Sequence, residues 1–355
     1  MMTGKRMAAF VLAAVMAVAS LWCVAPDKAE AAERIYTIVI DPGHGGNNAG
    51  ANMYGPIEKD MTLETAFSMY QLLSQFDNVR VYLTRNNDAS VSLDERAAMA
   101  KSVNADFLFS LHYNATTDHV SYGSEVLISR VQPYHSMGFQ FGVMELEELK
   151  NMGMYVRGMK ARAGRQGDYY GLLRSASAYG VPAVIIEHCY VDQAVDAARC
   201  ALPAQQQAFG TADAIAVAKY FGLYSTALGL DYRGYTKPQV PASGLIAASV
   251  DDGDAPTEVS ATQISANAAT GQVVIKVRGV DVNDPILYFT YSLDEGLTFA
   301  APYMQWYQAD PINNTSAQEF YLTLQLSPGQ NASVVIKVRN LFDHEAQSMP
   351  MQVVW

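Results

Sequence analysis

The sequence has few cysteines, which excludes one large class of extracellular fold. Three cysteines occur among 355 residues, and because Cys23 lies in an N-terminal apolar stretch, Cys189 and Cys200 remain for the folded chain. Small secreted domains that depend on disulfides carry many more. The chain must therefore bury hydrophobic cores of its own, and the sequence leaves open whether Cys189 and Cys200 pair or stay free.

Positive charge is also scarce. Lysine and arginine total 24 against 35 aspartates and glutamates, which gives a formal net charge of −11, and 50% of the residues are hydrophobic. Proteins that bind nucleic acid present a basic face to the phosphates. The composition therefore predicts a globular protein with no nucleic-acid partner.

Long apolar runs are missing beyond the N-terminus, where one covers residues 7–23. It follows Lys5 and Arg6 and precedes Ala29-Glu30-Ala31, which is the order of basic, apolar and small residues in a signal peptide. We predict a signal peptide over residues 1–31, with a membrane anchor as the alternative. The expected protein is secreted and keeps no stable membrane anchor after cleavage.

The next part of the chain, residues 32–224, alternates short apolar runs with helical periodicity, as α/β domains do. Predicted strands cover residues 35–40, 79–83, 106–111, 126–129 and 182–186. Predicted helices cover residues 60–75, 93–103, 138–160 and 204–220.

The last third has a different character. Residues 225–256 contain Gly, Pro, Ser and acidic residues with little periodicity, which indicates a linker. Residues 257–355 contain about six short strand-like runs separated by turn residues, and these predict a small all-β domain, a sandwich of immunoglobulin-like type. Its residues suggest no chemistry, so an adhesive or wall-targeting module and a simple spacer both remain open.

Polar residues follow three of the predicted strands directly. His44 lies in the Gly-rich loop after the first strand, His112 follows the strand over 106–111, and Glu187 follows the strand over 182–186. Ligands and catalytic groups of open α/β sheets gather at the carboxyl ends of strands. We therefore expect these three side chains to meet at one site.

Two histidines and one carboxylate make a three-ligand zinc site that leaves the fourth position for water. Glu58 is the preferred carboxylate because it follows the Gly55-Pro56 turn and precedes a helix, and Glu64 is a weaker choice. Glu187 is then free to act as the general base. Asp41 or another loop acceptor is expected to orient the unligated nitrogen of a histidine.

Each of these signals has an ordinary structural explanation when taken alone. A single histidine at a strand end is more often structural than a ligand, and the conclusion rests on three such residues occurring together. His188 beside Cys189 also suggests a nucleophilic dyad. Neighbouring residues of a strand point to opposite faces, which argues against it.

An ordered set of motifs across the first domain resembles the zinc-dependent N-acetylmuramoyl-L-alanine amidases of bacterial cell walls. The motifs are IVIDPGHGG (38–46), EKD (58–60), LDER (93–96), AD (105–106), SLHYNA (110–115), RGMK (157–160), LR (173–174) and PAVIIE (182–187).

The resemblance implies zinc ligands at His44, Glu58 and His112 and a catalytic glutamate at Glu187, in agreement with the residues chosen above. It also implies a mixed sheet of about six strands flanked by helices, and positions near the cleft for Asn114 and Arg174 in substrate binding. The implied reaction is hydrolysis of the amide bond between N-acetylmuramic acid and L-alanine in peptidoglycan. The expected location is the cell wall or periplasmic space of a bacterium.

One departure from the family pattern follows Glu187. The family continues with Gly, Phe, a hydrophobic residue, Ser and Asn, whereas this chain reads HCYVD over residues 188–192. The departure affects the expected shape of the substrate groove more than the hydrolysis. Two other functions stay open: a zinc peptidase or deacetylase with the same ligands, and a catalytically inactive cell-wall-binding module.

Overall fold

The computed structural model describes residues 34–240, 251, 253–306 and 318–355. The predicted signal peptide over residues 1–31 lies outside these ranges. Within them, no helix is both long and apolar enough to cross a membrane. Residues 36–355 form one compact unit.

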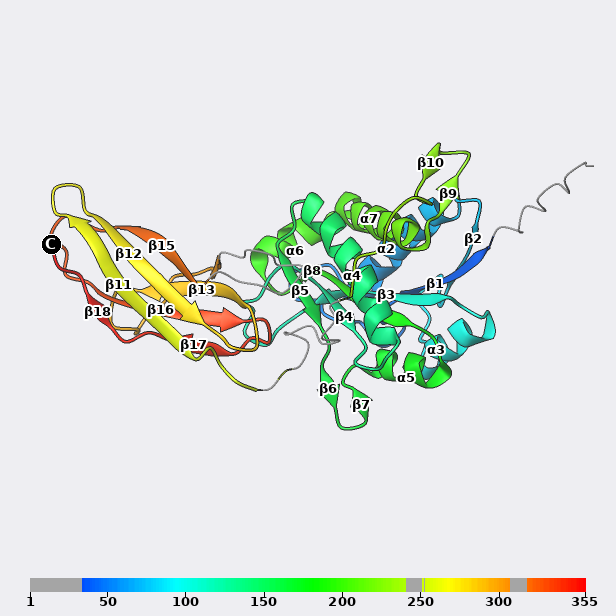
Figure 1. Ribbon diagram of the computed structural model, residues 1–355, viewed down its shortest axis with the longest axis horizontal. Helices are drawn as coiled ribbons and strands as arrows, with labels where there is room; N and C mark the ends of the chain where they lie inside the picture. The colour runs from blue at the N-terminus through cyan, green and yellow to red at the C-terminus, as the bar shows by residue number, and fades with distance from the viewer. Residues whose placement is uncertain (1–33, 241–250, 252, 307–317) are drawn as a thin grey trace, which may run out of the picture. The chain divides into compact units, whose positions relative to one another are not determined.

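The centre of the α/β part is a six-stranded mixed sheet, as the family resemblance implied, and its strand order is β2-β1-β3-β8-β4-β5 (Figure 1). The four strands β2, β1, β3 and β8 are parallel, β4 is antiparallel to β8, and β5 is parallel to β4. The strand bounds are Val79–Leu83 (β2), Tyr36–Pro42 (β1), Phe107–Asn114 (β3), Ala183–Tyr190 (β8), Ser124–Ile128 (β4) and Val156–Lys160 (β5).

Helices cover both faces of this sheet, which explains why its central strands are apolar almost without interruption. Ile38 and Ile40 pack in a core with residues of three helices, whereas Val39 between them belongs to a second core on the other face. The first face carries α2 (Glu58–Leu73), α4 (Tyr134–Asn151) and α7 (Pro203–Phe221), and the second carries α3 (Leu93–Ser102) and α5 (Gly171–Tyr179). The short helix α6 (Ala194–Cys200) follows β8.

The helix predicted over residues 138–160 is wrong in its second half. Helix α4 ends at Asn151, Gly153 has a left-handed φ of 81°, and the chain then enters strand β5. A glycine in this conformation just after a helix is a common stop signal. The helix predicted over residues 60–75 begins two residues earlier, so that Glu58 stands in the first turn of α2.

The C-terminal part contains two antiparallel sheets around one hydrophobic core. All six predicted strands are present, and β14 and β17 are additional short ones. The first sheet is β11 (Glu258–Asn267), β12 (Gln272–Val280) and β15 (Glu319–Gln325). The second is β14 (Met304–Gln305), β13 (Ile286–Ser292), β16 (Ser333–Asn340) and β17 (Glu345–Gln347), with β18 (Met351–Gln352) pairing β16.

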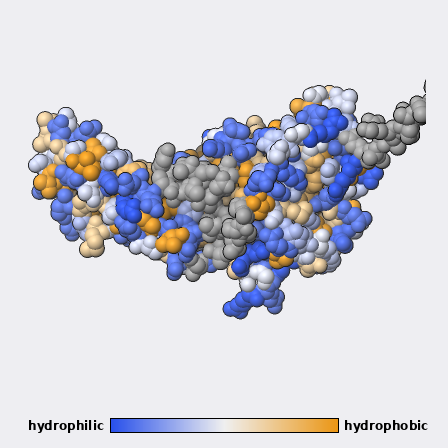
Figure 2. All heavy atoms as spheres, in the orientation of Figure 1, coloured by the Kyte–Doolittle hydropathy of each residue, from blue (hydrophilic) through white to orange (hydrophobic). Residues whose placement is uncertain are grey.

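Smaller features complete the chain. The hairpin β6 (Ala163–Gly164) and β7 (Gly167–Asp168) follows the sheet strand β5. The hairpin β9 (Tyr224–Ser225) and β10 (Leu230–Asp231) stands at the start of the predicted linker. A disulfide joins Cys189 to Cys200. On the face drawn in Figure 2, hydrophobic residues occur in small groups among hydrophilic ones.

Candidate metal centre

His44, Glu58 and His112 converge from three different elements. His44 lies in the loop after β1, Glu58 in the first turn of α2, and His112 near the end of β3. One ligand atom from each lies within 4.8 Å of the others. The oxygen Glu58 Oε1 is 2.9 Å from His44 Nε2 and 3.1 Å from His112 Nδ1. Two imidazoles and one carboxylate at this spacing fit the ligand set of a catalytic zinc ion.

Glu58 is the best-anchored of the three ligands. Its Oε1 also accepts from the backbone N–H of Tyr113 at 3.0 Å, and its Oε2 accepts from that of Ala51 at 2.8 Å. Burial by itself would raise the pKa of Glu58, but hydrogen bonds and charge interactions with His112 and His44 outweigh it and hold the pKa well below its usual range. The carboxylate is therefore ionised, as a metal ligand must be.

Glu58 also changes the pKa of His44, which it raises. Burial would lower the pKa of His44, but the hydrogen bond and charge of Glu58 raise it above its ordinary value. His44 Nδ1 lies 3.0 Å from Asn48 Oδ1, so that this nitrogen carries the proton and Nε2 faces Glu58. A partner of this kind fixes the tautomer and ring orientation of a metal-binding histidine.

Asp41 does not have the role that the sequence suggested for it. Its carboxylate accepts from Ser110, Thr84 and Arg96, and none of these contacts involves a histidine. The alternative of another loop acceptor is the one observed, in Asn48. Asp41 instead holds Arg96, which reaches back to the loop that carries His44.

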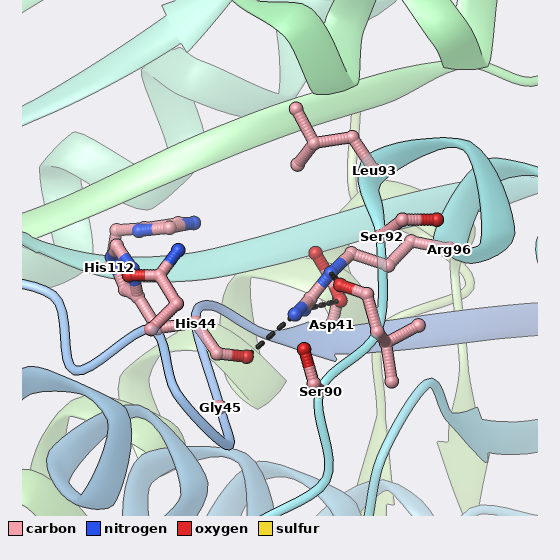
Figure 3. Close-up of a pocket in the computed structure, with 10 residues that line it drawn as sticks. Asp41, His44, Gly45, Ser90, Ser92, Leu93, Arg96 and His112 are labelled. Atoms are coloured by element: carbon pink, nitrogen blue, oxygen red, sulfur yellow. Dashed lines mark hydrogen bonds and ion pairs between the residues drawn. The ribbon is translucent and has the colours of Figure 1, made fainter.

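Two buried arginines fix this loop. Arg96 donates to the carbonyl oxygen of His44 at 2.6 Å (Figure 3). It also donates to that of Pro42 at 2.7 Å, and Arg85 donates to that of Gly43 at 2.8 Å. His44 has a left-handed φ of 61°, which such contacts help to maintain. Gly43 must lack a side chain, because a Cβ there would lie 2.3 Å from the ring of His112.

Glu187 lies on the strand next to His112. The two residues are Cα partners on β8 and β3, and Glu125 on β4 is the Cα partner of Glu187 on its other side. Partner residues on neighbouring strands point to the same face of a sheet, so these three side chains form a row. A bulge between His112 and Asn114 interrupts the pairing at this point, as is common next to active sites.

The carboxyl group of Glu187 is less satisfied than that of Glu58. Its Oε2 is buried and has no hydrogen-bond partner among the described residues. Burial, and then the charges of Glu58 and Glu125, raise the pKa of Glu187 well above its usual range. A half-buried acid with one buried, unpartnered oxygen beside a metal-ligand set is the kind of group that handles protons in catalysis.

A cleft of about 270 Å³ opens beside the two histidines. His44 and His112 line it at one end, and Arg96, Ser90, Ser92 and Leu93 line it at the other (Figure 3). It gives a small polar ligand access to the metal-binding side chains.

Asn114 and Arg174 have separate environments. Asn114 ends β3, and its Nδ2 donates to Glu125 Oε1 at 2.8 Å. Arg174 is exposed on α5 and donates to the carbonyl oxygens of Asp168 and Tyr169. The weaker ligand candidate Glu64 accepts from Gln207 and is absent from the His44, Glu58 and His112 group.

The His188 and Cys189 pair is built into the structure. His188 is fully buried, with Nδ1 3.0 Å from the carbonyl oxygen of His112 and Nε2 3.0 Å from Asp213 Oδ1. Cys189 is consumed by the disulfide with Cys200. The pair therefore supports the strand that carries Glu187 and forms no nucleophilic dyad.

Sequence reasoning missed Asn48, Arg85 and Glu125. Asn48 follows a Gly-rich loop with a histidine four residues before it, which is a usable signal. Glu125 lies in a short strand whose neighbouring strand β5 was predicted as helix, so its partners could not be foreseen.

Comparison with known proteins supplies the chemical context. The sequence profile described as N-acetylmuramoyl-L-alanine amidase matches residues 38–219. The amidase CwlM of Bacillus licheniformis is 33% identical over 196 residues, which cover 54% of this chain and 72% of CwlM. The amidase AmiC of Escherichia coli O6:H1 is 39% identical over 95 residues, 26% of this chain and 23% of AmiC.

Among solved structures, Cwp6 from Clostridium difficile matches with a TM-score of 0.49 and 29% identity, over 52% of this chain and 29% of Cwp6. Apart from CwlM, the relatives named here are therefore matched over less than a third of their own length.

Proposed function

We propose that this chain, which belongs to the family of N-acetylmuramoyl-L-alanine amidases, is a zinc-dependent hydrolase of bacterial peptidoglycan. The bond cleaved is the amide between N-acetylmuramic acid and L-alanine. The observation that carries the proposal is the convergence of His44, Glu58 and His112, with Glu187 on the neighbouring strand.

His44, Glu58 and His112 would hold the zinc ion. When bound, zinc supplies a Lewis acid that polarises the scissile carbonyl and lowers the pKa of water. Glu58 contributes a negative charge to the ligand set. Asn48 keeps Nε2 of His44 directed toward Glu58.

Glu187 has the separate role of moving the proton. It would accept a proton from the attacking water and deliver it to the leaving nitrogen of L-alanine. Its freedom from hydrogen bonds at Oε2 supports this role, because a carboxyl oxygen committed to the protein could not exchange protons with a substrate. Asn114 and Arg174 are proposed to contact the muropeptide.

The domain boundaries and the cellular location are proposed on the same basis. Residues 1–31 are proposed as a signal peptide, residues 32–224 as the catalytic domain, residues 225–256 as a linker and residues 257–355 as a small all-β domain of immunoglobulin-like type. The substrate lies outside the cytoplasmic membrane, so we place the protein in the cell wall or periplasmic space. The complete set of ligand and base residues disfavours an inactive binding module.

Analysis of the products tests the proposed bond. Purified peptidoglycan is digested with the full chain, and the released peptides are labelled at their free amino groups and sequenced. An amidase releases peptides that begin with L-alanine and leaves the glycan strands intact. Peptides with other N-termini would indicate a peptidase, free acetate a deacetylase, and binding without products a wall-binding module.

A further inference from the structure

Glu125 is a buried carboxylate that the mechanism above does not use. It stands beside Glu187 in the sheet and is 1% exposed. A second carboxylate next to a catalytic one costs free energy unless cations compensate it. The cations that pair with Glu125 therefore show to which part of the molecule this carboxylate is connected.

Two cations from β5 compensate Glu125. Arg157 Nε lies 2.7 Å from Glu125 Oε2, and Lys160 Nζ lies 2.9 Å from the same oxygen. Burial by itself would raise the pKa of Glu125, but the charges of Lys160 and Arg157 outweigh it and lower the pKa. The other oxygen, Oε1, accepts from Asn114, which lies two residues after the ligand His112.

The remaining donors of Arg157 are directed toward residues of the β domain. Its Nη1 donates to the hydroxyl of Tyr288 at 2.7 Å, and its Nη2 lies 3.1 Å from the carbonyl oxygen of Leu341 and 3.2 Å from Asp343 Oδ1. Arg157 is fully buried. The guanidinium thus has one side on Glu125 and the other on the C-terminal part of the chain.

Further contacts make this junction specific. Asp343 Oδ1 accepts from Ser121 at 2.6 Å, and the hydroxyl of Tyr288 donates to the carbonyl oxygen of Tyr122. The rings of Tyr122, Tyr155 and Tyr288 pack against one another with centroids 4.8 to 5.5 Å apart. Buried ion pairs among packed aromatic rings hold their partners in one arrangement, because each loses its compensation if another moves.

We propose that the C-terminal β domain helps to position the catalytic groups. Its residues Tyr288 and Asp343 fix Arg157. Arg157 in turn holds Glu125 against Asn114 and beside Glu187. Glu125, Arg157, Tyr288 and Asp343 are positioning residues, since they act through Asn114 and Glu187. The inference rests on the proposed function for its kinetic readout. It assigns the β domain a role that neither a tether nor a spacer would have.

The test uses two nearly isosteric variants of the β domain in the full chain. Tyr288→Phe removes one hydroxyl, and Asp343→Asn removes one charge while tolerating the left-handed φ of 69° at this position. The matched control is Tyr155→Phe, which removes a hydroxyl at the same junction whose hydrogen bond goes to the carbonyl oxygen of Leu287 and not to Arg157.

We expect both test variants to lower kcat for muropeptide hydrolysis by about 5- to 20-fold with unchanged zinc content, while Tyr155→Phe stays within about twofold. Combination with Glu125→Gln separates positioning from general destabilisation. In the Glu125→Gln background, Asp343→Asn should have little further effect, because both changes break the same network. Wild-type kcat in both test variants, or losses that multiply with Glu125→Gln, would overturn the proposal.

An inactive wild type is a different result, because it refutes the proposed function. The wild type, Glu125→Gln, Asp343→Asn and the double variant are then compared by unfolding in urea. Non-additive stability changes for Glu125→Gln and Asp343→Asn would uphold the link between the β domain and Glu125, and additive changes would refute it.

Discussion

The loop that presents His44 is shaped by neighbouring side chains and by two arginines that lie far from it in the sequence. Arg96 and Arg85 hold its carbonyl oxygens, Asp41 holds Arg96, and Asn48 holds the imidazole. At the scale of single residues, the metal site therefore depends on these supports as well as on its ligands.

Replacement of Asn48 tests this support. In Asn48→Ala, His44 loses the acceptor for its Nδ1 proton, and we expect zinc affinity to fall about tenfold. Asn48→Asp keeps an acceptor oxygen at the same place and should retain the affinity. Both are measured by competition with a chromophoric zinc chelator, and equal affinity in wild type and Asn48→Ala would show that the contact does not orient the ligand.

At the scale of elements, a buried polar cluster supports β8 on the face of the sheet that α4 and α7 cover. His188 on β8 faces Asp213 on α7, and Glu145 on α4 is also buried nearby. Burial lowers the pKa of His188 to about 4 and raises the pKa of Asp213 to about 8. Since Nδ1 of neutral His188 donates to the carbonyl of His112, its Nε2 must accept, and protonated Asp213 is the donor.

This cluster predicts that stability falls as the pH rises. An aspartate in the unfolded chain titrates near its ordinary pKa of about 3.9. Between about pH 3.9 and pH 8, Asp213 therefore binds one more proton in the folded state than in the unfolded state. Below about pH 6.5 the lowered pKa of His188 offsets this contribution, because an unfolded histidine binds a proton there that the folded one does not, so the decline in the free energy of unfolding falls mainly between about pH 6.5 and 8. Urea unfolding between pH 5 and 9 measures it.

Asp213→Asn provides the control for this prediction, because an amide donates to His188 Nε2 at every pH. The variant should show a smaller decline in stability over the same range. A wild-type stability that rises from pH 5 to 8, or a decline that is unchanged in Asp213→Asn, would contradict the assigned protonation.

The elements also show why part of the site could be predicted and part could not. Strands β1, β3 and β8 are buried on both faces, so their apolar runs and the polar residues that end them stand out in the sequence. Strand β5 contains Arg157 and Lys160, which are buried because Glu125 pairs with them. Such pairing between distant residues leaves no periodic pattern. For the same reason the sequence could not decide between Asp41 and another loop acceptor for the histidine, since the partner of Asp41, Arg96, is 55 residues away.

At the scale of the whole molecule, the ligands tie together the loop after β1, the start of α2 and the end of β3. Zinc that binds the folded state alone should therefore stabilise it, by about 4 kcal/mol when free zinc exceeds the dissociation constant about a thousandfold. Thermal unfolding with zinc and after chelation measures the difference. His112→Ala should show no such shift, and a shift of equal size in this variant would place the bound metal elsewhere.

The central claim is that His44, Glu58 and His112 hold a zinc ion beside the base Glu187. The most direct measurement is zinc content together with peptide release from peptidoglycan, for the wild type, Glu187→Gln and His112→Ala. The account predicts one zinc per chain and release of L-alanine-initiated peptides in the wild type, retained zinc with at least about a hundredfold loss of activity in Glu187→Gln, and loss of both in His112→Ala. A wild type that releases these peptides without zinc, or a fully active Glu187→Gln, would contradict it.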